Sequence, residues 1–285
     1  PWTLPLFIKQ KMINPFTAGL MSFLVDGNRT MLVAGTRSSG KTSLLGALML
    51  EIMPKYRIIT IEDTPELAVE AMRRLKYDIL SMKVRSALLK TTNEVSADDG
   101  IRTSLRLGDS SLIVGEIRSV EAKALYEAMR VGALANVVAG TIHGASPYGV
   151  FDRVVNDLEV PLTSFKATDC VIVANPVKTP DGMHSNRRVV QLTEVRKHWT
   201  KDPLEEKGFV DLLKYNVEKD DIEPTEDLIN GDSEIIKSIA GNVKGWAGNW
   251  DAVYDNILLR ARTKQEIVNV AEKLNKPEIL EAGFN

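Results

Sequence analysis

The stretch that decides the fold is a short apolar run followed by a glycine-rich loop, Met31-Leu32-Val33-Ala34-Gly35-Thr36-Arg37-Ser38-Ser39-Gly40-Lys41-Thr42. The residues after it, 43–50, are mostly apolar and favour a helix. A buried strand, a loop of the pattern G-x-x-x-x-G-K-[ST] and a helix form a phosphate-binding unit, because backbone N–H groups and the helix N-terminus converge on phosphate oxygens. We therefore predict that residues 35–43, from Gly35 to Ser43, bind a nucleotide.

Four residues of this loop indicate the chemistry of the site. Lys41 is placed to give a positive charge to the β- and γ-phosphates, and the Thr42 hydroxyl is placed to ligate Mg²⁺. Gly35 and Gly40 allow backbone torsions that a Cβ atom would forbid. The loop therefore predicts a nucleoside triphosphate and Mg²⁺ as cofactors.

Composition excludes several classes of function. The chain has 285 residues, of which 44% are hydrophobic and 26% charged, as in a globular protein of one or two domains. Its net charge of −2 gives no general attraction to nucleic acid or to a membrane surface. No apolar stretch approaches the roughly 20 residues of a membrane span. The single cysteine, Cys170, excludes an internal disulfide and lies in an apolar run that predicts burial. We expect neither nucleic-acid binding nor direct membrane insertion.

Apolar runs alternate with helical patterns between residues 30 and 175. Five short runs that are apolar on both faces predict strands of a helix-covered parallel sheet: 31–34, 57–61, 111–114, 136–141 and 169–174. Residues 120–131 predict a helix with Ser119 as its N-cap and Gly132 at its end. The turn Pro180-Asp181-Gly182 and the run 188–192 predict a hairpin at one edge. The pattern indicates a doubly wound α/β core.

We divide the chain into a linker and lead-in helix at 1–29, a core at 30–199 and a mainly helical region at 200–285. Because the chain starts at Pro1, we expect a fragment that begins in a linker. Residues 218–234 carry eight acidic residues and one lysine, which indicates a solvated connection or an exposed helix face. A capping-box pattern begins at Thr263, and apolar residues follow at helical spacing, Ile267, Val270, Ala271 and Leu274.

Two carboxylates follow apolar runs, at the positions where open α/β sheets form their sites. Glu62 directly follows the run 57–61, and Glu116 comes two residues after the run 111–114. Nucleotide hydrolysis needs one carboxylate that orients water and another that holds the metal's water shell. Each residue taken singly is also compatible with a solvated strand end, but the pair beside a phosphate loop favours a hydrolytic site.

His143 follows the run 136–141, between Gly140 and Gly144. The chain has three histidines, so a metal site built from several of them is not expected. At this strand end His143 is either structural or a group that contacts the γ-phosphate. The residues alone leave both interpretations open.

Motifs in a characteristic order resemble those of the type II/type IV secretion ATPases. The phosphate loop is followed by Ile61-Glu62-Asp63-Thr64-Pro65-Glu66-Leu67, then Leu105-Arg106-Leu107-Gly108-Asp109 with Val114-Gly115-Glu116-Ile117-Arg118, then Gly140-Thr141-Ile142-His143-Gly144. The resemblance covers residues 32–155. The loop and the last motif are more similar to the archaeal branch than to bacterial retraction motors.

The resemblance implies a RecA-like P-loop core with a mostly parallel sheet, and a Mg²⁺-dependent ATPase without the family's upstream domain. It implies a homo-oligomer, a hexamer, that works in the cytoplasm at an inner-membrane platform protein. Glu62 matches the acid assigned to water activation, and Glu116 the Walker B acid, which with Thr42 would hold Mg²⁺ through water. His143 matches the histidine motif, and Arg153 a further basic position. The candidate arginine fingers, which would act on a neighbouring subunit's nucleotide, are Arg102, Arg106 and Arg118.

We therefore expect an ATP-hydrolysing motor subunit of a secretion, type IV pilus or archaellum-like machine, with Lys41, Glu62, Glu116 and His143 as its catalytic residues. One alternative is a nucleic-acid translocase or helicase, which the net charge of −2 and the 6% aromatic content do not favour. Another is a nucleotide-binding scaffold that does not hydrolyse, against which Glu62 and Glu116 argue.

Overall fold

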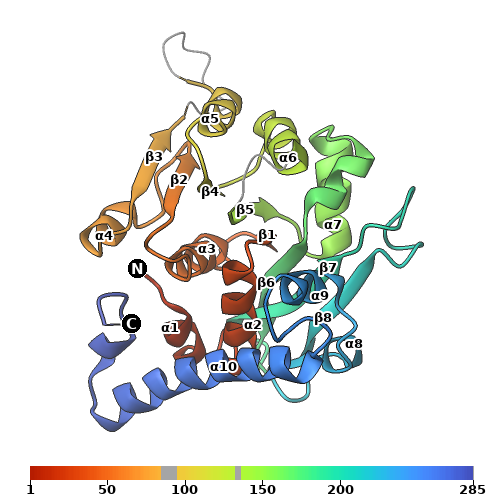
Figure 1. Cartoon of the computed structure of the whole chain (residues 1–285). Helices are drawn as coiled ribbons and strands as arrows, with labels where there is room; N and C mark the ends of the chain where they lie inside the picture. The colour runs from red at the N-terminus through yellow and green to blue at the C-terminus, as the bar shows by residue number, and fades with distance from the viewer. Residues whose placement is uncertain (85–94, 132–135, 285) are drawn as a thin grey trace.

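The computed structural model describes residues 1–84, 95–131 and 136–284. Its centre is a nine-stranded sheet with the order β3-β2-β4-β5-β1-β6-β7-β8-β9 (Figure 1). The strands are β1 Thr30–Gly35, β2 Arg57–Glu62, β3 Ile79–Lys83, β4 Ser110–Val114, β5 Val138–His143, β6 Cys170–Lys178, β7 Ser185–Val195, β8 Phe209–Asn216 and β9 Asp221–Pro224. The five predicted strands are confirmed as β1, β2, β4, β5 and β6.

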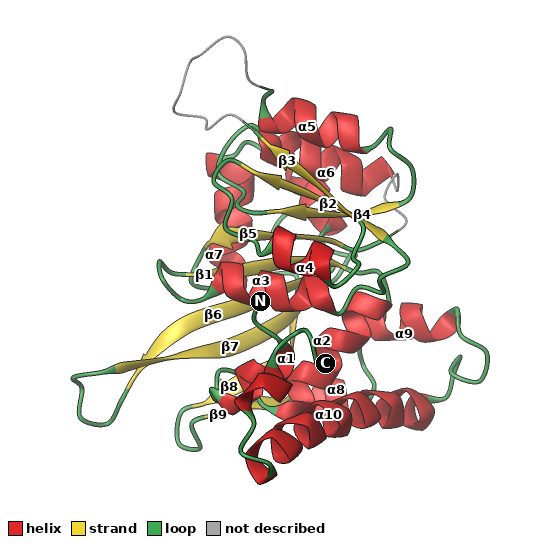
Figure 2. Cartoon of the chain, turned by 90° about the vertical axis from the view of Figure 1, so that its left-hand side faces the viewer, coloured by secondary structure: helices red, strands yellow, loops and turns green. Residues whose placement is uncertain are grey.

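The sheet has a parallel part and an antiparallel part. Strands β3, β2, β4, β5, β1 and β6 pair in parallel, with β1 between β5 and β6. From β6 to β9 the pairing is antiparallel. The predicted hairpin is confirmed as β6–β7, which projects beyond the helical layers (Figure 2). Its predicted place at an edge is wrong, because β8 and β9 continue the sheet beyond β7. The phosphate loop therefore leaves the sheet from a central strand.

Helices cover both faces of the sheet because its strands alternate buried side chains between two cores. Met31 and Val33 of β1 belong to the core formed with α2, α3 and α10, and Leu32 and Ala34 to the core formed with α5, α6 and α7. The α-helices are α1 Leu4–Lys9, α2 Pro15–Asp26, α3 Lys41–Leu50, α4 Val69–Arg74, α5 Ala97–Ser104, α6 Glu121–Val131, α7 Pro147–Asp152, α8 Glu226–Ile229, α9 Glu234–Gly241 and α10 Trp250–Lys273. The π-helical turn is η1 Arg153–Asp157, and the 3-10 helices are η2 Leu162–Ala167 and η3 Pro277–Leu280.

The start of α6 differs from the prediction. The helix begins at Glu121, whose carboxylate accepts hydrogen bonds from the N–H groups of Arg118 and Ser119 and from the Ser119 hydroxyl. The Ser119 hydroxyl therefore donates to the side chain of the first helical residue. The predicted end at Gly132 lies outside the described residues. Cys170 is buried as predicted, with 0% exposure.

Sequence patterns missed three strands, β3, β8 and β9. Strand β9 lies inside the acidic segment 218–234, for which no strand was predicted. Ile222 of this strand is buried in the core, while its acidic neighbours are more exposed. With so few apolar residues among the charges, the segment shows no strand pattern in the sequence. The sheet consequently continues past residue 199, and the division of the chain at that residue remains a prediction.

The long helix α10 also differs from the prediction. It begins at Trp250, where the Asn249 side chain accepts a hydrogen bond from the Ala252 N–H, and it continues through the predicted start at Thr263. The Thr263 hydroxyl instead donates to the Leu259 carbonyl within the helix. Figure 2 shows α10 along the side of the molecule formed by α1, α2 and α8. Among the described residues, no helix combines the length and apolar character needed to cross a membrane.

Candidate nucleotide-binding site

A pocket of about 580 Å³ opens where β1 and β5 end and the chain leaves β4. It brings together most of the predicted site residues. Its lining residues are Arg37, Ser38, Lys41, Thr42, Glu66, Glu116, Arg118, Thr141, His143 and Arg153. The density of charged groups in one cavity suits a polyanion with a metal ion rather than an apolar ligand.

The phosphate loop has the geometry that anion binding needs. Gly40 adopts a left-handed backbone with φ 93°, and α3 begins at the next residue without a side-chain cap. The N–H groups of the first turn of α3 therefore remain available for phosphate oxygens. A Cβ atom on Gly35 would lie 2.1 Å from the Ala174 carbonyl oxygen, so only glycine fits there. The buried Ser39 hydroxyl has no hydrogen-bond partner among the described residues.

Lys41 reaches across this loop. Its ammonium donates a hydrogen bond of 2.7 Å to the Thr36 carbonyl, and the residue is 8% exposed. Burial lowers the pKa of Lys41, while the negative charges of Glu116 and Glu66 act in the opposite direction. The Lys41 ammonium is thus partly desolvated, and it can exchange its hydrogen bond to the Thr36 carbonyl for hydrogen bonds to phosphate oxygens.

Glu116 lies at the centre of a charged cluster. One of its carboxylate oxygens is 3.1 Å from Nε2 of His143, and the other accepts a hydrogen bond from Arg118. Arg118 also lies 3.6 Å from Asp63. Burial, and next the positive charge of Lys41, lowers the pKa of His143, so its imidazole is neutral at pH 7 and can donate one hydrogen bond. The structure thus joins two of the predicted catalytic residues directly.

Glu62 occupies a different environment from the one predicted. It is 4% exposed, and its Oε1 accepts hydrogen bonds from the N–H groups of Glu66 (2.9 Å) and Leu67 (3.0 Å). Burial raises the pKa of Glu62. Glu62 is not among the residues that line the pocket, whereas the exposed Glu66 is. The signal for Glu66 was present, because it is the second glutamate of the motif that begins at Glu62.

The three candidate arginine fingers lie in different places. Arg118 lines the pocket of its own chain. Arg102 lies on α5 outside the pocket and is 3.2 Å from both Asp98 and Glu127. Arg106 follows α5, is exposed, and has no ion pair within the described ranges. The structure therefore does not bring the three together.

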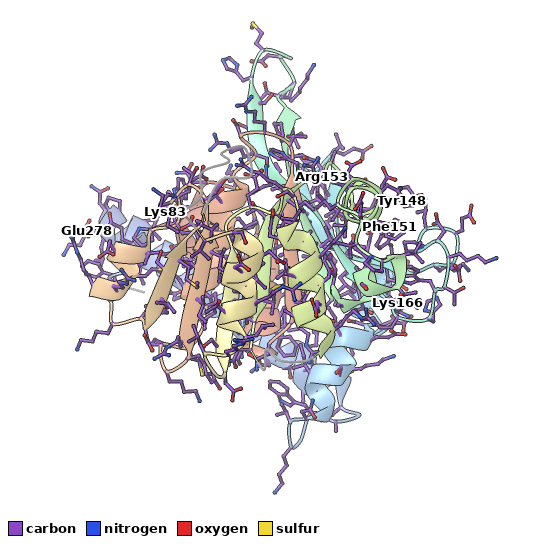
Figure 3. All side chains as sticks on the ribbon, turned by 90° about the horizontal axis from the view of Figure 1, so that it is seen from above. Lys83, Tyr148, Phe151, Arg153, Lys166 and Glu278 are labelled. Carbon is purple, nitrogen blue, oxygen red and sulfur yellow. The ribbon has the colours of Figure 1, made fainter. Side chains whose placement is uncertain are left out.

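Arg153 reaches the pocket from the first position of the π-helical turn η1. Its buried Nε has no hydrogen-bond partner within the described parts of the chain. Phe151, two residues earlier, anchors this segment by packing on the rings of Phe165 (5.2 Å between centroids) and Trp199 (5.7 Å). Figure 3, seen from above, labels Phe151 next to Tyr148, with Arg153 nearer the centre of the view. Arg153, which the resemblance marked only as a further basic position, is therefore a cation of the pocket.

The oxygen atoms of the pocket fit Mg²⁺ bound together with phosphates. Thr42 and Glu116 supply a hydroxyl and a carboxylate to one cavity. Among the described residues, no group of three His, Cys, Asp or Glu side chains could hold a metal unaided. Mg²⁺ usually binds through one or two protein oxygens, several waters and substrate phosphates, so the Thr42 hydroxyl and the Glu116 carboxylate are suitable ligands for it.

Comparisons with known proteins agree on the fold. An uncharacterized protein of Methanocaldococcus jannaschii is 29% identical over 235 residues, which are 82% of this chain and 80% of that protein. The type IV secretion system protein PtlH of Bordetella pertussis is 28% identical over 68% of this chain and 57% of its own length. The crystal structure of the VirB11 ATPase from the Brucella suis type IV secretion system has a TM-score of 0.51 at 23% identity. That match covers 67% of this chain and 54% of the VirB11 chain, and it supports the RecA-like fold. The chain thus spans little more than half of the last two proteins.

One family model covers most of the site and of the sheet. The model described as type II/IV secretion system protein matches residues 6–200. This range contains the phosphate loop, both glutamates of the Glu62 motif, Glu116 and His143. The chain belongs to the type II/IV secretion system protein family.

Proposed function

We propose that this chain is the ATP-hydrolysing motor subunit of a secretion, type IV pilus or archaellum-like machine. The observation that carries the proposal is the single pocket in which the phosphate loop meets Glu66, Glu116, His143 and Arg153. A phosphate loop alone would support nucleotide binding, whereas carboxylates and cations around the same cavity support phosphoryl transfer to water. The wider setting of the proposal is a cytoplasmic hexamer at an inner-membrane platform protein.

In this proposal the residues act on the γ-phosphoryl group of ATP. Lys41 and Arg153 neutralise charge that develops on the phosphate oxygens, and the neutral imidazole of His143 donates a hydrogen bond to them. Thr42 and Glu116 would hold Mg²⁺, which supplies further charge neutralisation at the β- and γ-phosphates. In the structure Nε2 of His143 faces Glu116, so in this proposal the single N–H of His143 moves from Glu116 to the γ-phosphate when ATP binds and returns when the phosphate is lost.

We assign the orientation of water to Glu66 rather than to Glu62. Glu66 lines the cavity, while both of the hydrogen bonds recorded for Glu62 come from the backbone of residues 66 and 67. Glu62 then acts as a positioning residue that holds the turn bearing Glu66. This assignment differs from the role predicted for Glu62 from the motif alone.

Two glutamine variants separate these roles. Glu66→Gln should lower kcat by about 10²-fold or more, as expected when a group that orients or activates water is lost, with ATP affinity nearly unchanged. Glu62→Gln should keep most of the activity, because a glutamine oxygen can still accept both backbone hydrogen bonds. The measurements are steady-state ATPase rates with Mg²⁺ and with EDTA, and ATP affinity by calorimetry.

Lys41→Ala provides the inactive control for the same assays. An inactive Glu62→Gln beside an active Glu66→Gln would return the water-orienting role to Glu62. A wild-type protein that binds ATP without hydrolysing it, also at high protein concentration, would refute the motor and favour a nucleotide-binding scaffold.

A further inference from the structure

A cavity of about 530 Å³ lies among the end of α8, α9 and the start of α10, and we call it the α9 cavity. None of its lining residues lines the phosphate pocket. All of them lie between residues 230 and 253, beyond the range 6–200 that the family model matches. Figure 2 shows α9 on the opposite side of the molecule from the projecting β6–β7 hairpin. The α9 cavity therefore belongs to a part of the chain that the proposed nucleotide chemistry does not use.

Two indole rings and an aliphatic floor make up the apolar part of this cavity. Ile236 and Val253 are 0% and 1% exposed, whereas Trp246 and Trp250 are only partly buried. The volume lies within the ~300–1,000 Å³ range of ligand sites. Partly exposed tryptophans in a hollow are typical of binding hot spots, because an apolar group of the partner loses its contact with water against them.

The walls of the α9 cavity are held in place by hydrogen bonds. Glu194 of β7 is 0% exposed and accepts hydrogen bonds from the Ser233 hydroxyl and from the Glu234 N–H, the latter at 2.9 Å. The start of α9 is thus tied to the sheet. The Trp250 indole N–H donates to the Ile229 carbonyl at 2.9 Å, which ties the start of α10 to the end of α8. A partner would therefore find the cavity already formed, which lowers the free-energy cost of binding.

The part of the chain that forms this cavity is acidic. Residues 226–253 carry five acidic residues and two lysines, a net charge of −3, whereas the whole chain carries −2. Glu226 and Asp227 of α8 are exposed, and neither has an ion pair within the described ranges. Such a charge disfavours phosphates, nucleic acid and an anionic membrane surface, and it favours a cationic partner.

Asp232 is the carboxylate that lines the cavity itself. It lies 3.5 Å from the Lys237 ammonium and 3.5 Å from the Arg196 guanidinium. Arg196 also lies 3.0 Å from Glu194 and 3.8 Å from Glu234. One guanidinium thus faces three carboxylates, and the rim of the cavity keeps its negative charge.

We propose that the α9 cavity is a docking site for a basic segment of a partner protein that inserts an apolar side chain. The inserted side chain packs against the Trp246 and Trp250 rings, over the aliphatic floor. Lysines or arginines on either side of it pair with Asp232 and with the carboxylates of α8. An apolar anchor gives affinity, and the opposite charges around it select the partner. This inference goes beyond the proposed function and does not depend on it.

The probe for this site is a fluorescein-labelled hexapeptide with a leucine–phenylalanine pair between two lysines and two arginines. Its affinity for the 285-residue chain would be measured by fluorescence anisotropy. One control peptide has glutamates in place of the four basic residues, and a second has glycines in place of the leucine–phenylalanine pair. The basic apolar peptide should bind at least about tenfold more tightly than either control, and added salt should weaken it.

Three variants locate the binding. Trp246→Ala should weaken the basic apolar peptide by about tenfold or more, as expected when a hot-spot ring is lost. Trp2→Ala is the matched control, because Trp2 is also partly exposed but lies outside the α9 cavity, and it should leave the affinity unchanged. Lys237→Gln removes a cation that competes for Asp232, so it should tighten binding by about twofold or more.

No measurable binding by the wild type, or equal binding of the basic apolar peptide and either control peptide, would overturn the proposal. Unchanged affinity in Trp246→Ala and Lys237→Gln would do the same. Lys237 is exposed, so its variant keeps the test decisive if Trp246→Ala lowers the melting temperature.

Two further measurements test other occupants. Self-association by light scattering, or binding to vesicles of anionic lipid, that Trp246→Ala abolishes would overturn the proposal in favour of a second copy or a membrane. Lys41→Ala should bind the peptide as the wild type does, because Lys41 lines only the phosphate pocket. A failure of docking is therefore distinguishable from a failure of the nucleotide function.

Discussion

Glu62 and Glu66 are four residues apart and differ in exposure and in hydrogen bonding. Glu62 is buried and accepts two backbone hydrogen bonds, while Glu66 is exposed at the pocket. A Cβ atom on Gly115 would lie 2.8 Å from Cγ of Glu62, so the chain after β4 packs closely on this side chain. At the residue scale, the packing around a carboxylate therefore determines whether it can reach a substrate.

The buried Glu62 carboxyl predicts a pH dependence of stability. Its pKa is raised by burial above the ordinary value of 4.5, so the folded protein binds this proton more tightly than the unfolded chain. This contribution to stability is present at low pH and is lost as pH rises through the raised pKa. Glu62→Gln, which cannot ionise, should therefore gain melting temperature relative to wild type as pH rises from about 4.5 to 7.

Denaturation curves of both proteins across this pH range check the prediction. Glu278→Gln is the matched control, since Glu278 is exposed on η3 at the edge of the molecule away from Arg153 (Figure 3). A constant difference between Glu62→Gln and wild type over the range would contradict a raised pKa in the folded protein.

At the scale of elements, the contact between α2 and α10 depends on one small residue. A Cβ atom on Gly19 of α2 would lie 2.6 Å from the Ile257 carbonyl oxygen and 2.7 Å from the Ala261 nitrogen. Both are backbone atoms of α10, which cannot move as a side-chain end can. The absence of a side chain at Gly19 lets the two helices approach, and this approach buries the middle of α10.

Gly19→Ala should consequently destabilise the protein by about 1–3 kcal/mol, the usual cost of overpacking a core. Gly46→Ala in α3 is the matched control, because nothing lies within 4 Å of the added Cβ and alanine favours a helix. It should leave stability unchanged or raise it by up to about 1 kcal/mol. Urea denaturation measures both, and equal effects of the two substitutions would contradict the close-contact explanation.

At the scale of the whole molecule, the arginines bear on assembly. Arg118 and Arg153 already line the pocket of their own chain, and Arg102 is paired with Asp98 and Glu127. Arg106 is exposed and has no ion pair among the residues that the structure describes. It is therefore the best placed of the three predicted fingers to act on a neighbouring subunit.

We expect ATP turnover to depend on assembly, since an arginine supplied by another subunit accelerates hydrolysis by about 10³–10⁵-fold. Specific activity should rise with protein concentration, and Arg106→Ala should lower it more than Arg102→Ala does. Mixing Lys41→Ala with Arg106→Ala subunits should restore part of the activity, because some sites then contain neither defect. Constant specific activity across a wide concentration range, in a protein shown to be monomeric by light scattering, would contradict an arginine acting between subunits.

Sequence patterns predicted the central part of the fold better than its edges. The strands β1, β2, β4, β5 and β6 are buried on both faces, and such strands are continuous apolar runs that a sequence displays directly. The edge strands carry a weaker signal, because β3 is short and largely exposed and β9 places its buried Ile222 between two acidic residues. The capping-box pattern at Thr263 gave a wrong helix start, because a four-residue pattern also occurs by chance inside helices. Packing against α2 lets α10 continue through residue 263.

The sequence by itself determined the phosphate loop, the order of the parallel strands along the chain, and the motifs that place Glu116 and His143 at strand ends. These features are local, because a strand, a loop and a helix follow one another within about 20 residues and their chemistry needs no distant partner. Only the tertiary structure decided that Glu66 rather than Glu62 faces the pocket, that Arg153 enters it, and that Glu194 of β7 fixes the start of α9 beside the α9 cavity. Those outcomes depend on which remote segments pack together, and no pattern within one segment contains that information.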